Sequence, residues 1–275
     1  MVSSADRSEP DRVRLGVRSS LLSNLRERPL RLDQYLVRSG YFRSREQARR
    51  AVEGGAVSVA GTAASKPSHA VPDGAAVEVR GVVEPFVSRA GRKLAAALDA
   101  FAIDPRGRVC LDVGASTGGF TDCLLQRGAT RVYAVDVGHD QLAPTLRADP
   151  RVVSFEGVNA RRLPGDLLPE APDLATFDLS FISVLKVVPS VLPVLAPGAE
   201  LVILLKPQFE VGPAGVGKGG VVRDAELRRR VVAQRLAELE ALGLEGIGCI
   251  ESPVPGMSGN RESLVGLRRP REDRA

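Results

Sequence analysis

The stretch Leu111-Asp112-Val113-Gly114-Ala115-Ser116-Thr117-Gly118-Gly119-Phe120-Thr121-Asp122 decides the fold of most of the chain. Apolar residues predict a buried strand over Val109–Val113, and the end of the stretch opens a helix predicted over Gly119–Arg127. A glycine-rich turn between the two lets the backbone approach a ligand closely. Open α/β sheets bind ligands at such turns, at the carboxyl ends of their strands. The stretch therefore predicts a ligand site in an α/β domain.

The kind of ligand follows from what this turn lacks and from the next strand. There is no Gly-Lys-Ser/Thr, as a P-loop needs, and Gly114-Ala115-Ser116 breaks the G-x-G-x-x-G pattern of dinucleotide sites. The strand Val132–Val135 ends at Asp136, whose carboxylate can accept hydrogen bonds from both ribose hydroxyls of a nucleoside. The pattern is similar to the S-adenosylmethionine loop of methyltransferases. A nicotinamide site and a purely structural turn are the alternatives.

Predicted strands and helices alternate through residues 93–275. The predicted strands are Val109–Val113, Arg131–Val137, Val152–Phe155, Ala175–Leu179, Leu201–Leu205, Glu245–Glu251 and Ser263–Leu267. Helical stretches are predicted over Leu142–Arg147, Val184–Leu195 and Ala225–Leu242, the last with Leu227, Val231, Leu239 and Leu242 on one stripe. This alternation predicts an α/β, Rossmann-like doubly wound sheet with helices on both faces.

A second, smaller unit is predicted over residues 30–81. Leu32, Tyr35 and Leu36 recur at helical spacing, and Gly40 ends that helix. Ser44 and Gln47 then form a capping box for a second helix, which is followed by short alternating strands at 57–59 and 77–79. We interpret residues 1–29 as a flexible basic tail and residues 82–92 as a linker.

Composition narrows the class of protein. The chain has 275 residues and a net charge of +5, with 38 lysines and arginines against 33 acidic residues. Three cysteines without a C-x-x-C pair and two histidines predict neither a disulfide framework nor a metal site. No apolar run reaches the length of a membrane span, and the first residues lack the apolar core of a signal peptide. We expect a cytoplasmic protein, whose basic charge suits a nucleic-acid partner.

Four charged residues carry the chemistry. Asp178 and Lys206 each end an apolar predicted strand, which places them in the ligand crevice. Lys93 lies in Ser88-Arg89-Ala90-Gly91-Arg92-Lys93-Leu94, and Glu262 in Gly259-Asn260-Arg261-Glu262. Only five of the 38 basic residues are lysines, and two of these five belong to this set. Singly, each residue is equally typical of a helix cap or a surface charge.

The motifs at 88–94, 112–122, 178–183 and 206–210 together resemble the TlyA family of ribosomal RNA 2′-O-methyltransferases, often named haemolysins. Residues 30–81 resemble the S4 RNA-binding domain of that family, and the larger domain resembles the FtsJ-like fold. The resemblance implies a catalytic Lys-Asp-Lys-Glu tetrad at Lys93, Asp178, Lys206 and Glu262. Glu262 is followed by Ser263, where the family pattern has an aromatic residue. The tail 1–29 has no counterpart.

The resemblance implies roles for these residues. Lys206 would act as the base that takes the proton of a ribose 2′-hydroxyl, because lysine shifts its pKa readily in a crowded site. Asp178 would orient it, and Lys93 and Glu262 would position the ribose. The sulfonium leaving group is already charged, so no metal is needed. The cofactor S-adenosylmethionine would be held by Asp112, Gly114, Ala115, Ser116, Thr117, Gly118, Gly119, Phe120, Asp136 and Asn159; Asn159 is equally typical of a turn.

The expected partner is ribosomal RNA in the 30S subunit, the 50S subunit or both, with cytidine as the target. The basic amino-terminal region favours both subunits. In the family, this methylation affects sensitivity to tuberactinomycin-type antibiotics. Arginines of the S4-like unit and one at the start of the larger domain would contact phosphates. They are Arg31, Arg38, Arg43, Arg45, Arg49, Arg50 and Arg89. A merely solvated helix face is the alternative for this group.

Three other functions compete. Pseudouridine synthases also carry an S4-like domain, and Arg31-Leu32-Asp33 resembles their catalytic motif, but it opens the small domain here. A non-catalytic ribosome assembly factor would have no use for Lys93, Asp178 and Lys206. A membrane-lysing haemolysin lacks support, because the chain has no Trp and no strongly amphipathic basic helix.

Overall fold

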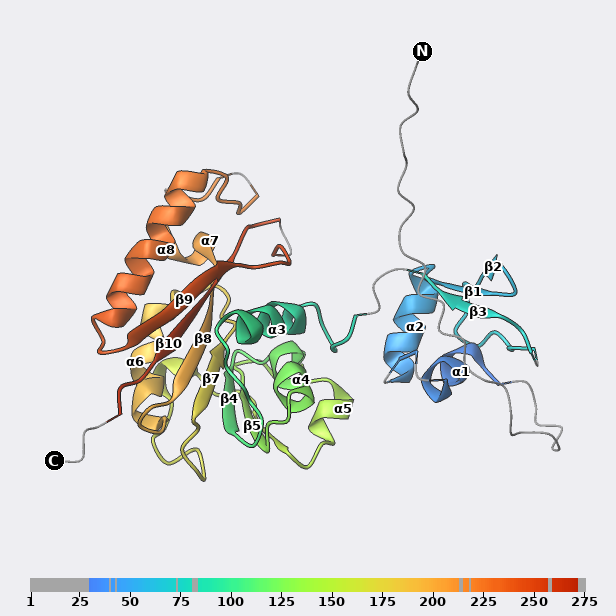
Figure 1. Cartoon of the computed structure of the whole chain (residues 1–275), viewed down its shortest axis with the longest axis horizontal. Coiled ribbons are helices and arrows are strands. Elements are labelled where there is room, and N and C mark those ends of the chain that lie inside the picture. Colours follow the sequence, from blue (N-terminus) through green and yellow to red (C-terminus); the bar gives the residue numbers. More distant parts are fainter. Residues whose placement is uncertain are drawn as a thin grey trace, which may run out of the picture.

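The computed structural model describes residues 30–271 except 40, 43, 73, 81–83, 213–214, 218 and 257–258. The predicted tail over 1–29 and the candidate Arg43 lie outside the described residues. The described chain folds into a small unit and a large one (Figure 1). Among the described residues, no helix is long and apolar enough to cross a membrane.

The small unit has the predicted order of two helices and a sheet. Its elements are α1 (Leu32–Arg38), α2 (Arg45–Glu53), β1 (Val57–Val59), β2 (Thr62–Ala63) and β3 (Val77–Val79), with strand order β2-β1-β3. The Gln47 amide donates to Ser44 Oγ at 3.3 Å, which confirms the predicted cap of α2. Leu32, Leu36 and Val52 form the core. The short strand β2 was not predicted.

The large unit is a seven-stranded sheet with strand order β6-β5-β4-β7-β8-β10-β9. Its strands are β4 (Val109–Val113), β5 (Arg131–Val135), β6 (Val152–Phe155), β7 (Leu174–Phe177), β8 (Glu200–Leu205), β9 (Glu245–Glu251) and β10 (Ser263–Arg268). Strands β4 to β8 are parallel, and β10 runs antiparallel between β8 and β9. The chain order reverses between β4 and β7, so the ligand crevice of an α/β sheet is expected at their carboxyl ends.

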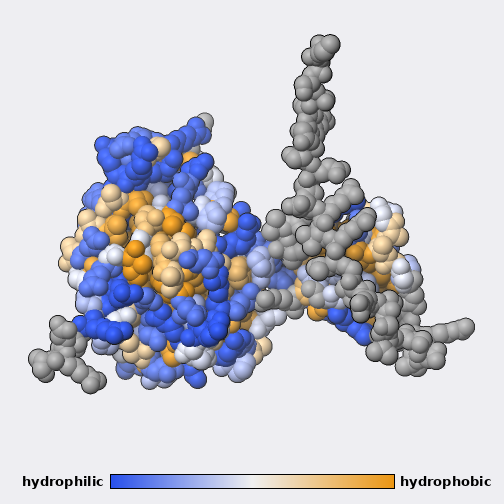
Figure 2. Space-filling model, in the orientation of Figure 1, coloured by the Kyte–Doolittle hydropathy of each residue, from blue (hydrophilic) through white to orange (hydrophobic). Residues whose placement is uncertain are grey.

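Helices cover both faces of this sheet, as predicted for a doubly wound fold. The helices are α3 (Ala90–Ala100), α4 (Gly119–Gln126), α5 (Pro144–Arg147), α6 (Val188–Val191), α7 (Pro207–Glu210) and α8 (Ala225–Glu240), with 3-10 turns η1 (Ala160–Arg162), η2 (Val184–Lys186) and η3 (Leu192–Val194). One core contains Leu94 and Phe120 from α3 and α4, and another contains Val191 and Leu239 from α6 and α8. Hydrophilic side chains gather over the amino-terminal end of α8 (Figure 2).

Three details differ from the prediction. The expected helix over 184–195 is broken into η2, α6 and η3, because Pro189 and Pro193 cannot donate backbone hydrogen bonds. Helix α8 ends at Glu240, so the prediction that Leu242 belongs to its apolar stripe is wrong, and 41% of Leu242 is exposed. Helix α3 begins at Ala90, inside the predicted linker.

Candidate active site

The four predicted catalytic residues lie at one edge of the large sheet. Asp178 and Lys206 directly follow β7 and β8, which end side by side. Glu262 precedes β10 and reaches the same edge because β10 runs antiparallel to β8. Lys93 lies in α3, which packs against β8 and β10. Parallel strand ends thus bring together residues from four distant parts of the sequence.

These four residues form two ion pairs. Lys206 Nζ lies 2.7 Å from Asp178 Oδ1 and donates a hydrogen bond to Ser180 Oγ at 2.9 Å. Lys93 Nζ lies 2.5 Å from Glu262 Oε2. Both members of the second pair are buried, whereas Asp178 and Lys206 are half-buried beside the exposed Ser180. The Lys206–Asp178 pair is therefore the more open of the two.

The Oδ1 atom of Asp178 is shielded from solvent. Within the described part of the chain it accepts no hydrogen bond of good geometry, but it is ion-paired with Lys206. A buried carboxylate oxygen normally has a hydrogen-bond partner. The ion pair with Lys206 takes the place of that partner here.

The glycine turn packs directly against the catalytic segments. Gly114 has φ +84°, and a Cβ atom there would lie 2.7 Å from the carbonyl oxygen of Asp178. A Cβ atom at Gly119 would lie 2.2 Å from Ser88 Oγ, in the segment that leads into α3 and Lys93. Glycine is favoured at both positions because a side chain would collide with Asp178 in one case and with the start of α3 in the other.

Asp112 supports the turn from inside the sheet. It is fully buried, and Thr121 Oγ1 and Thr176 Oγ1 donate hydrogen bonds to its carboxylate at 2.7 and 3.0 Å. Burial raises the pKa of Asp112 to about 7, although both threonine hydrogen bonds act in the opposite direction. The structure places this predicted cofactor residue beneath the turn, where it ties β4 to α4 and β7.

Asp136 lies where a nucleoside ribose is expected. Its carboxylate accepts hydrogen bonds from the amides of Ser116 and Gly138, both at 2.7 Å. It lines a narrow pocket whose other walls include Ala115, Gln141, Leu142 and Glu156. The sequence analysis did not single out the last three. Glu156 directly follows β6, next to β5 in the sheet, and that position after a strand end was the available signal.

The remaining predicted cofactor residues divide into exposed and buried sets. Ser116 and Thr117 are exposed at the tip of the turn, whereas Gly118, Gly119 and Phe120 are buried where α4 begins. Asn159 Oδ1 accepts a hydrogen bond from the Arg161 amide at 3.1 Å and so caps η1. This contact is the turn role that the sequence left open for Asn159.

An aromatic pair beside Asp178 and Lys206, with one exposed and one half-buried ring, escaped the sequence analysis. Phe181 is 90% exposed and has φ +65°, and its ring centre lies 5.1 Å from that of Phe209. A positive φ is costly for a large side chain and is maintained mainly where function requires it. The sequence offered one signal, namely that each Phe lies three residues after a catalytic residue.

The candidate RNA-contacting arginines are mostly paired within the small unit. Arg31 and Arg45 donate to the two carboxylate oxygens of the buried Asp33 at 3.1 and 2.8 Å. Burial opposes ionisation of Asp33, but these hydrogen bonds outweigh it and lower the pKa of this carboxyl. Arg49 and Arg50 form ion pairs with Glu53 and Glu46 on α2. Arg38 and Arg89 are exposed.

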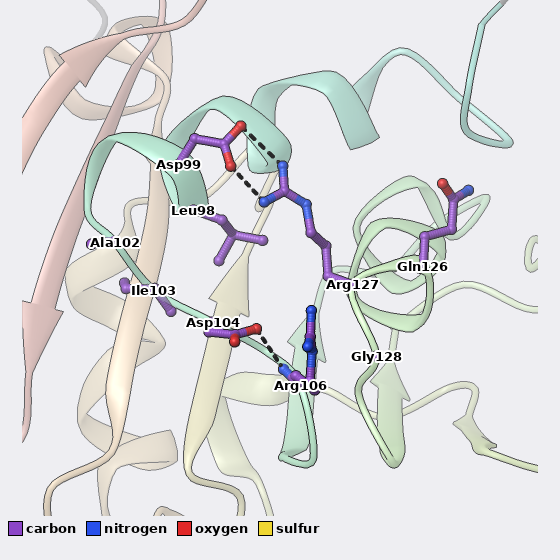
Figure 3. A pocket seen from close by; sticks show the side chains of 9 residues that line it. All are labelled: Leu98, Asp99, Ala102, Ile103, Asp104, Arg106, Gln126, Arg127 and Gly128. Carbon is purple, nitrogen blue, oxygen red and sulfur yellow. Dashed lines mark hydrogen bonds and ion pairs between the residues drawn. The ribbon is translucent and has the colours of Figure 1, made fainter.

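A wide groove lies at the opposite edge of the sheet, away from the catalytic residues. It is lined by the end of α3, the segment that leads into β4 and the end of α4 (Figure 3). Arg127 forms a two-pronged ion pair with Asp99 there, with nitrogen–oxygen distances of 2.5 and 3.0 Å. The groove lies at the amino ends of the strands, where α/β sheets do not hold their catalytic groups.

Comparison with known proteins gives consistent similarities. The profile of the FtsJ-like methyltransferase family matches residues 86–269, and that of the S4 domain matches residues 30–77. The chain is 48% identical to the 16S/23S rRNA (cytidine-2′-O)-methyltransferase TlyA of Mycobacterium tuberculosis, over 88% of this chain and 90% of that protein. It is 41% identical to hemolysin A of Brachyspira hyodysenteriae over 86% and 98% of the two chains. A solved structure from Streptococcus thermophilus, also named a hemolysin, superimposes with a TM-score of 0.68 at 38% identity, covering 90% of this chain and 92% of that one.

Proposed function

Since the chain belongs to the TlyA family of ribosomal RNA (cytidine-2′-O)-methyltransferases, we propose that Lys206 and Asp178 are its reacting pair and that cytidines of 16S and 23S rRNA are its targets. The chain is an S-adenosylmethionine-dependent enzyme that methylates rRNA on a ribose 2′-oxygen. The observation that carries the proposal is the contact of Lys206 Nζ with Asp178 Oδ1 and Ser180 Oγ at an open strand edge.

Lys206 and Asp178 move the proton. A ribose hydroxyl is a weak nucleophile, so it loses its proton as the oxygen–methyl bond forms and the methyl–sulfur bond breaks. The ammonium group of Lys206, which is ion-paired with Asp178, first releases its own proton. The resulting amine takes the proton of the hydroxyl, and the carboxylate of Asp178 stabilises the ammonium ion that forms again. The hydrogen bond with Ser180 Oγ directs the amine. A single hydroxyl held in line with the methyl group then needs no further activation.

Lys93 and Glu262 act differently from the reacting pair. They neutralise each other in a contact of 2.5 Å, and Glu262 is the more buried of the two carboxylates in the set. Their place beside Lys206 at the sheet edge supports a role in shaping the ribose site. Removing one partner would leave an uncompensated buried charge, which is strongly destabilising.

The residues of the glycine turn fit the nucleoside part of S-adenosylmethionine. The carboxylate of Asp136 accepts hydrogen bonds from two backbone amides and retains lone pairs that can accept hydrogen bonds from ribose hydroxyls. Ser116 and Thr117 expose backbone at the tip of the turn, and Glu156 and Leu142 border the adjoining pocket. When bound, this cofactor supplies a methyl group on a positively charged sulfur. Asp112 contributes indirectly, by fixing the turn through Thr121 and Thr176.

Phe181 and Phe209 supply a surface for the target base. A nucleotide inside folded RNA must be extruded before its ribose reaches a recessed site. Stacking on an aromatic side chain compensates for the lost stacking in the RNA and tolerates any base. The exposed ring of Phe181, supported by Phe209 and one residue from Ser180, is placed to receive it.

The small unit supplies RNA affinity. Asp33 holds the guanidinium groups of Arg31 and Arg45, which remain 45% and 56% exposed, in fixed positions. Fixed guanidinium groups bind phosphates with a smaller loss of side-chain entropy. Arg38 and Arg89 are exposed, and Arg49 and Arg50, which pair with glutamates on α2, are the other described members of the set.

The deciding experiment measures methyl transfer from labelled S-adenosylmethionine to unmethylated 30S and 50S subunits, followed by nucleoside analysis. We expect label in 2′-O-methylcytidine from both subunits, and none with Lys206→Ala. Label on a base instead of a ribose would show that Lys206 and Asp178 are not the reacting pair proposed here. Absence of label on either subunit, from protein that binds the cofactor, would overturn the ribosomal substrate.

A further inference from the structure

Glu210 is a buried carboxylate that the proposed reaction does not use. It ends α7, four residues after Lys206, and only 1% of its side chain is exposed. Three groups donate hydrogen bonds to it: Ser183 Oγ at 2.7 Å, the Val184 amide at 3.0 Å and Arg235 Nε at 2.7 Å. A buried carboxylate is tolerated only when it is satisfied in this way.

These hydrogen bonds join the two segments that carry the reacting pair. Ser183 and Val184 end the segment that begins with Asp178, and Glu210 ends the segment that begins with Lys206. The two segments are also joined at their start by the pairing of β7 with β8. Between these two junctions, the segments also meet where Lys206 contacts Asp178 and Ser180 and where Phe181 contacts Phe209. Glu210 therefore joins the segment after β7 to the segment after β8 at their ends away from the sheet.

Arg235 fixes Glu210 from a third element, α8. Its Nε donates to the carboxylate, and its Nη2 donates to the backbone carbonyl oxygen of Glu210 at 2.9 Å. Its remaining Nη1 pairs with Glu238 on the same helix. The planar guanidinium group thus binds the side chain and the backbone of Glu210 at the same time and fixes their relative orientation. A lysine has a single nitrogen and could not do this.

The reacting pair cannot fix its own geometry. The pair joins the two segments at one point, and a single contact between side chains does not fix the path of the backbone that carries them. The segment 178–183 has no regular secondary structure, and Phe181 within it has an unfavourable positive φ. Some outside contact must hold it. A displacement of about 1 Å in a reacting group costs on the order of 100-fold in rate.

We propose that Glu210 and Arg235 are positioning residues that set the Lys206–Asp178 contact by clamping the segment after β7 against the segment after β8. The inference rests on the proposed function, since it assigns a role relative to the reacting pair. The clamp acts on the chemical step. Neither residue touches the narrow nucleoside pocket or the small RNA-binding unit.

The test compares two isosteric variants, Glu210→Gln and Glu200→Gln. Glu200 offers a matched control, since its side chain is 15% exposed and pairs with Arg108, itself 19% exposed and bound also to Asp173. That pair ties β8 to β4 at the amino edge, away from the reacting residues. Both variants remove one carboxylate charge from a shielded arginine, and Glu200 pairs in addition with Arg268, which is 49% exposed. Both variants are therefore expected to lower the melting temperature.

Measurements of kcat, KM and Kd distinguish a loss of positioning from a loss of stability. We expect Glu210→Gln to lower kcat on ribosomal subunits about 30- to 100-fold, with KM for the subunits and the Kd for S-adenosylhomocysteine within about threefold of the original enzyme. Glu200→Gln should leave kcat within about twofold. Equal kcat values for the two variants, or a loss of cofactor binding in proportion to the loss of rate, would overturn the proposal.

Two further variants guard against misfolding of Glu210→Gln. Ser183→Ala removes one hydrogen bond and no charge, and Arg235→Lys keeps the charge but loses the fork. Each should lower kcat several-fold with unchanged KM, and unchanged kcat in both would refute the clamp. Failure of the proposed function is distinguishable, because the original enzyme itself would then transfer no methyl group to either subunit.

Discussion

The ammonium group of Lys206 lies 2.7 Å from Asp178 Oδ1, and this contact joins the ends of two adjacent parallel strands. Each residue is the first after its strand, so the spacing of the strands itself brings the two charges within reach. The contact is recessed at the sheet edge, beside an exposed aromatic ring. We therefore expect the ribose hydroxyl to bind beside this pair.

Lys206→Ala should abolish most of the activity. Losing a general base costs about 10²- to 10⁴-fold in rate, and cofactor affinity should not change because Lys206 lies outside the nucleoside pocket. Methyl transfer to 30S and 50S subunits and calorimetry with S-adenosylhomocysteine would measure the two effects. Lys186→Ala, at an exposed lysine of η2, is the control and should retain full rate. Equal rates for the two variants would exclude Lys206 as the base.

Substitution of Phe181 should lower the activity without lowering the stability of the protein. Phe181→Gly removes the stacking surface but also relieves the positive φ of 65°. We expect kcat/KM on ribosomal subunits to fall at least tenfold, since stacking on an aromatic contributes about 1–3 kcal/mol per base, while the melting temperature stays equal or rises. Phe181→Tyr keeps the ring and should keep the activity. Full activity of Phe181→Gly would show that the target base does not stack on Phe181.

Asp112 should make stability depend on pH. Because its pKa is about 7 in the folded protein and 3.8 ordinarily, the folded state holds a proton that the unfolded state releases between these values. Its contribution is therefore complete below about pH 4 and is lost as the pH rises to about 7, by at most about 1.4 kcal/mol per pH unit. Asp112→Asn lacks this titration. Urea unfolding at pH 5, 6, 7 and 8 should show the variant gaining on the original protein as pH rises, and parallel curves would contradict the expectation.

Arg38 should contribute to RNA binding through charge alone. It is exposed in the last turn of α1, and a phosphate contact predicts that Arg38→Ala weakens binding equally for different RNA sequences. The slope of log affinity against log salt should decrease by about 1. Filter binding with ribosomal RNA fragments at several salt concentrations would measure it. Arg151→Ala, at an arginine paired with Asp149 beside the amino end of β6, is the control and should leave the slope unchanged.

Much of the fold could be predicted because it depends on local patterns. The buried runs at β4 and β8, the cap at Ser44 and the alternation of strands and helices are visible in short windows. The errors also have local causes. The 184–195 segment has the apolar content of a helix, but its two prolines divide it. Leu242 has the right spacing for α8, but the helix has already ended.

The four predicted catalytic residues lie together in the structure, and the resemblance had implied one of their two pairs, that of Asp178 with Lys206. Position after a strand end, together with the family resemblance, selected Lys93, Asp178, Lys206 and Glu262. No spacing in the sequence showed that Lys93 pairs with Glu262 while Lys206 pairs with Asp178. Nor did it show that Asp112 lies beneath the turn, because that depends on threonines from β7 and α4 meeting one carboxylate.

The sequence by itself determined the class of sheet, the glycine turn and the charged residues at the strand ends, because each depends on hydrophobic periodicity or on backbone freedom within a few residues. Only the tertiary structure decided which charges neutralise each other, and that Glu210 binds both Arg235 and the segment after β7. Those outcomes depend on the order in which strands assemble and on the side chains that burial then brings together, and neither is encoded in local spacing.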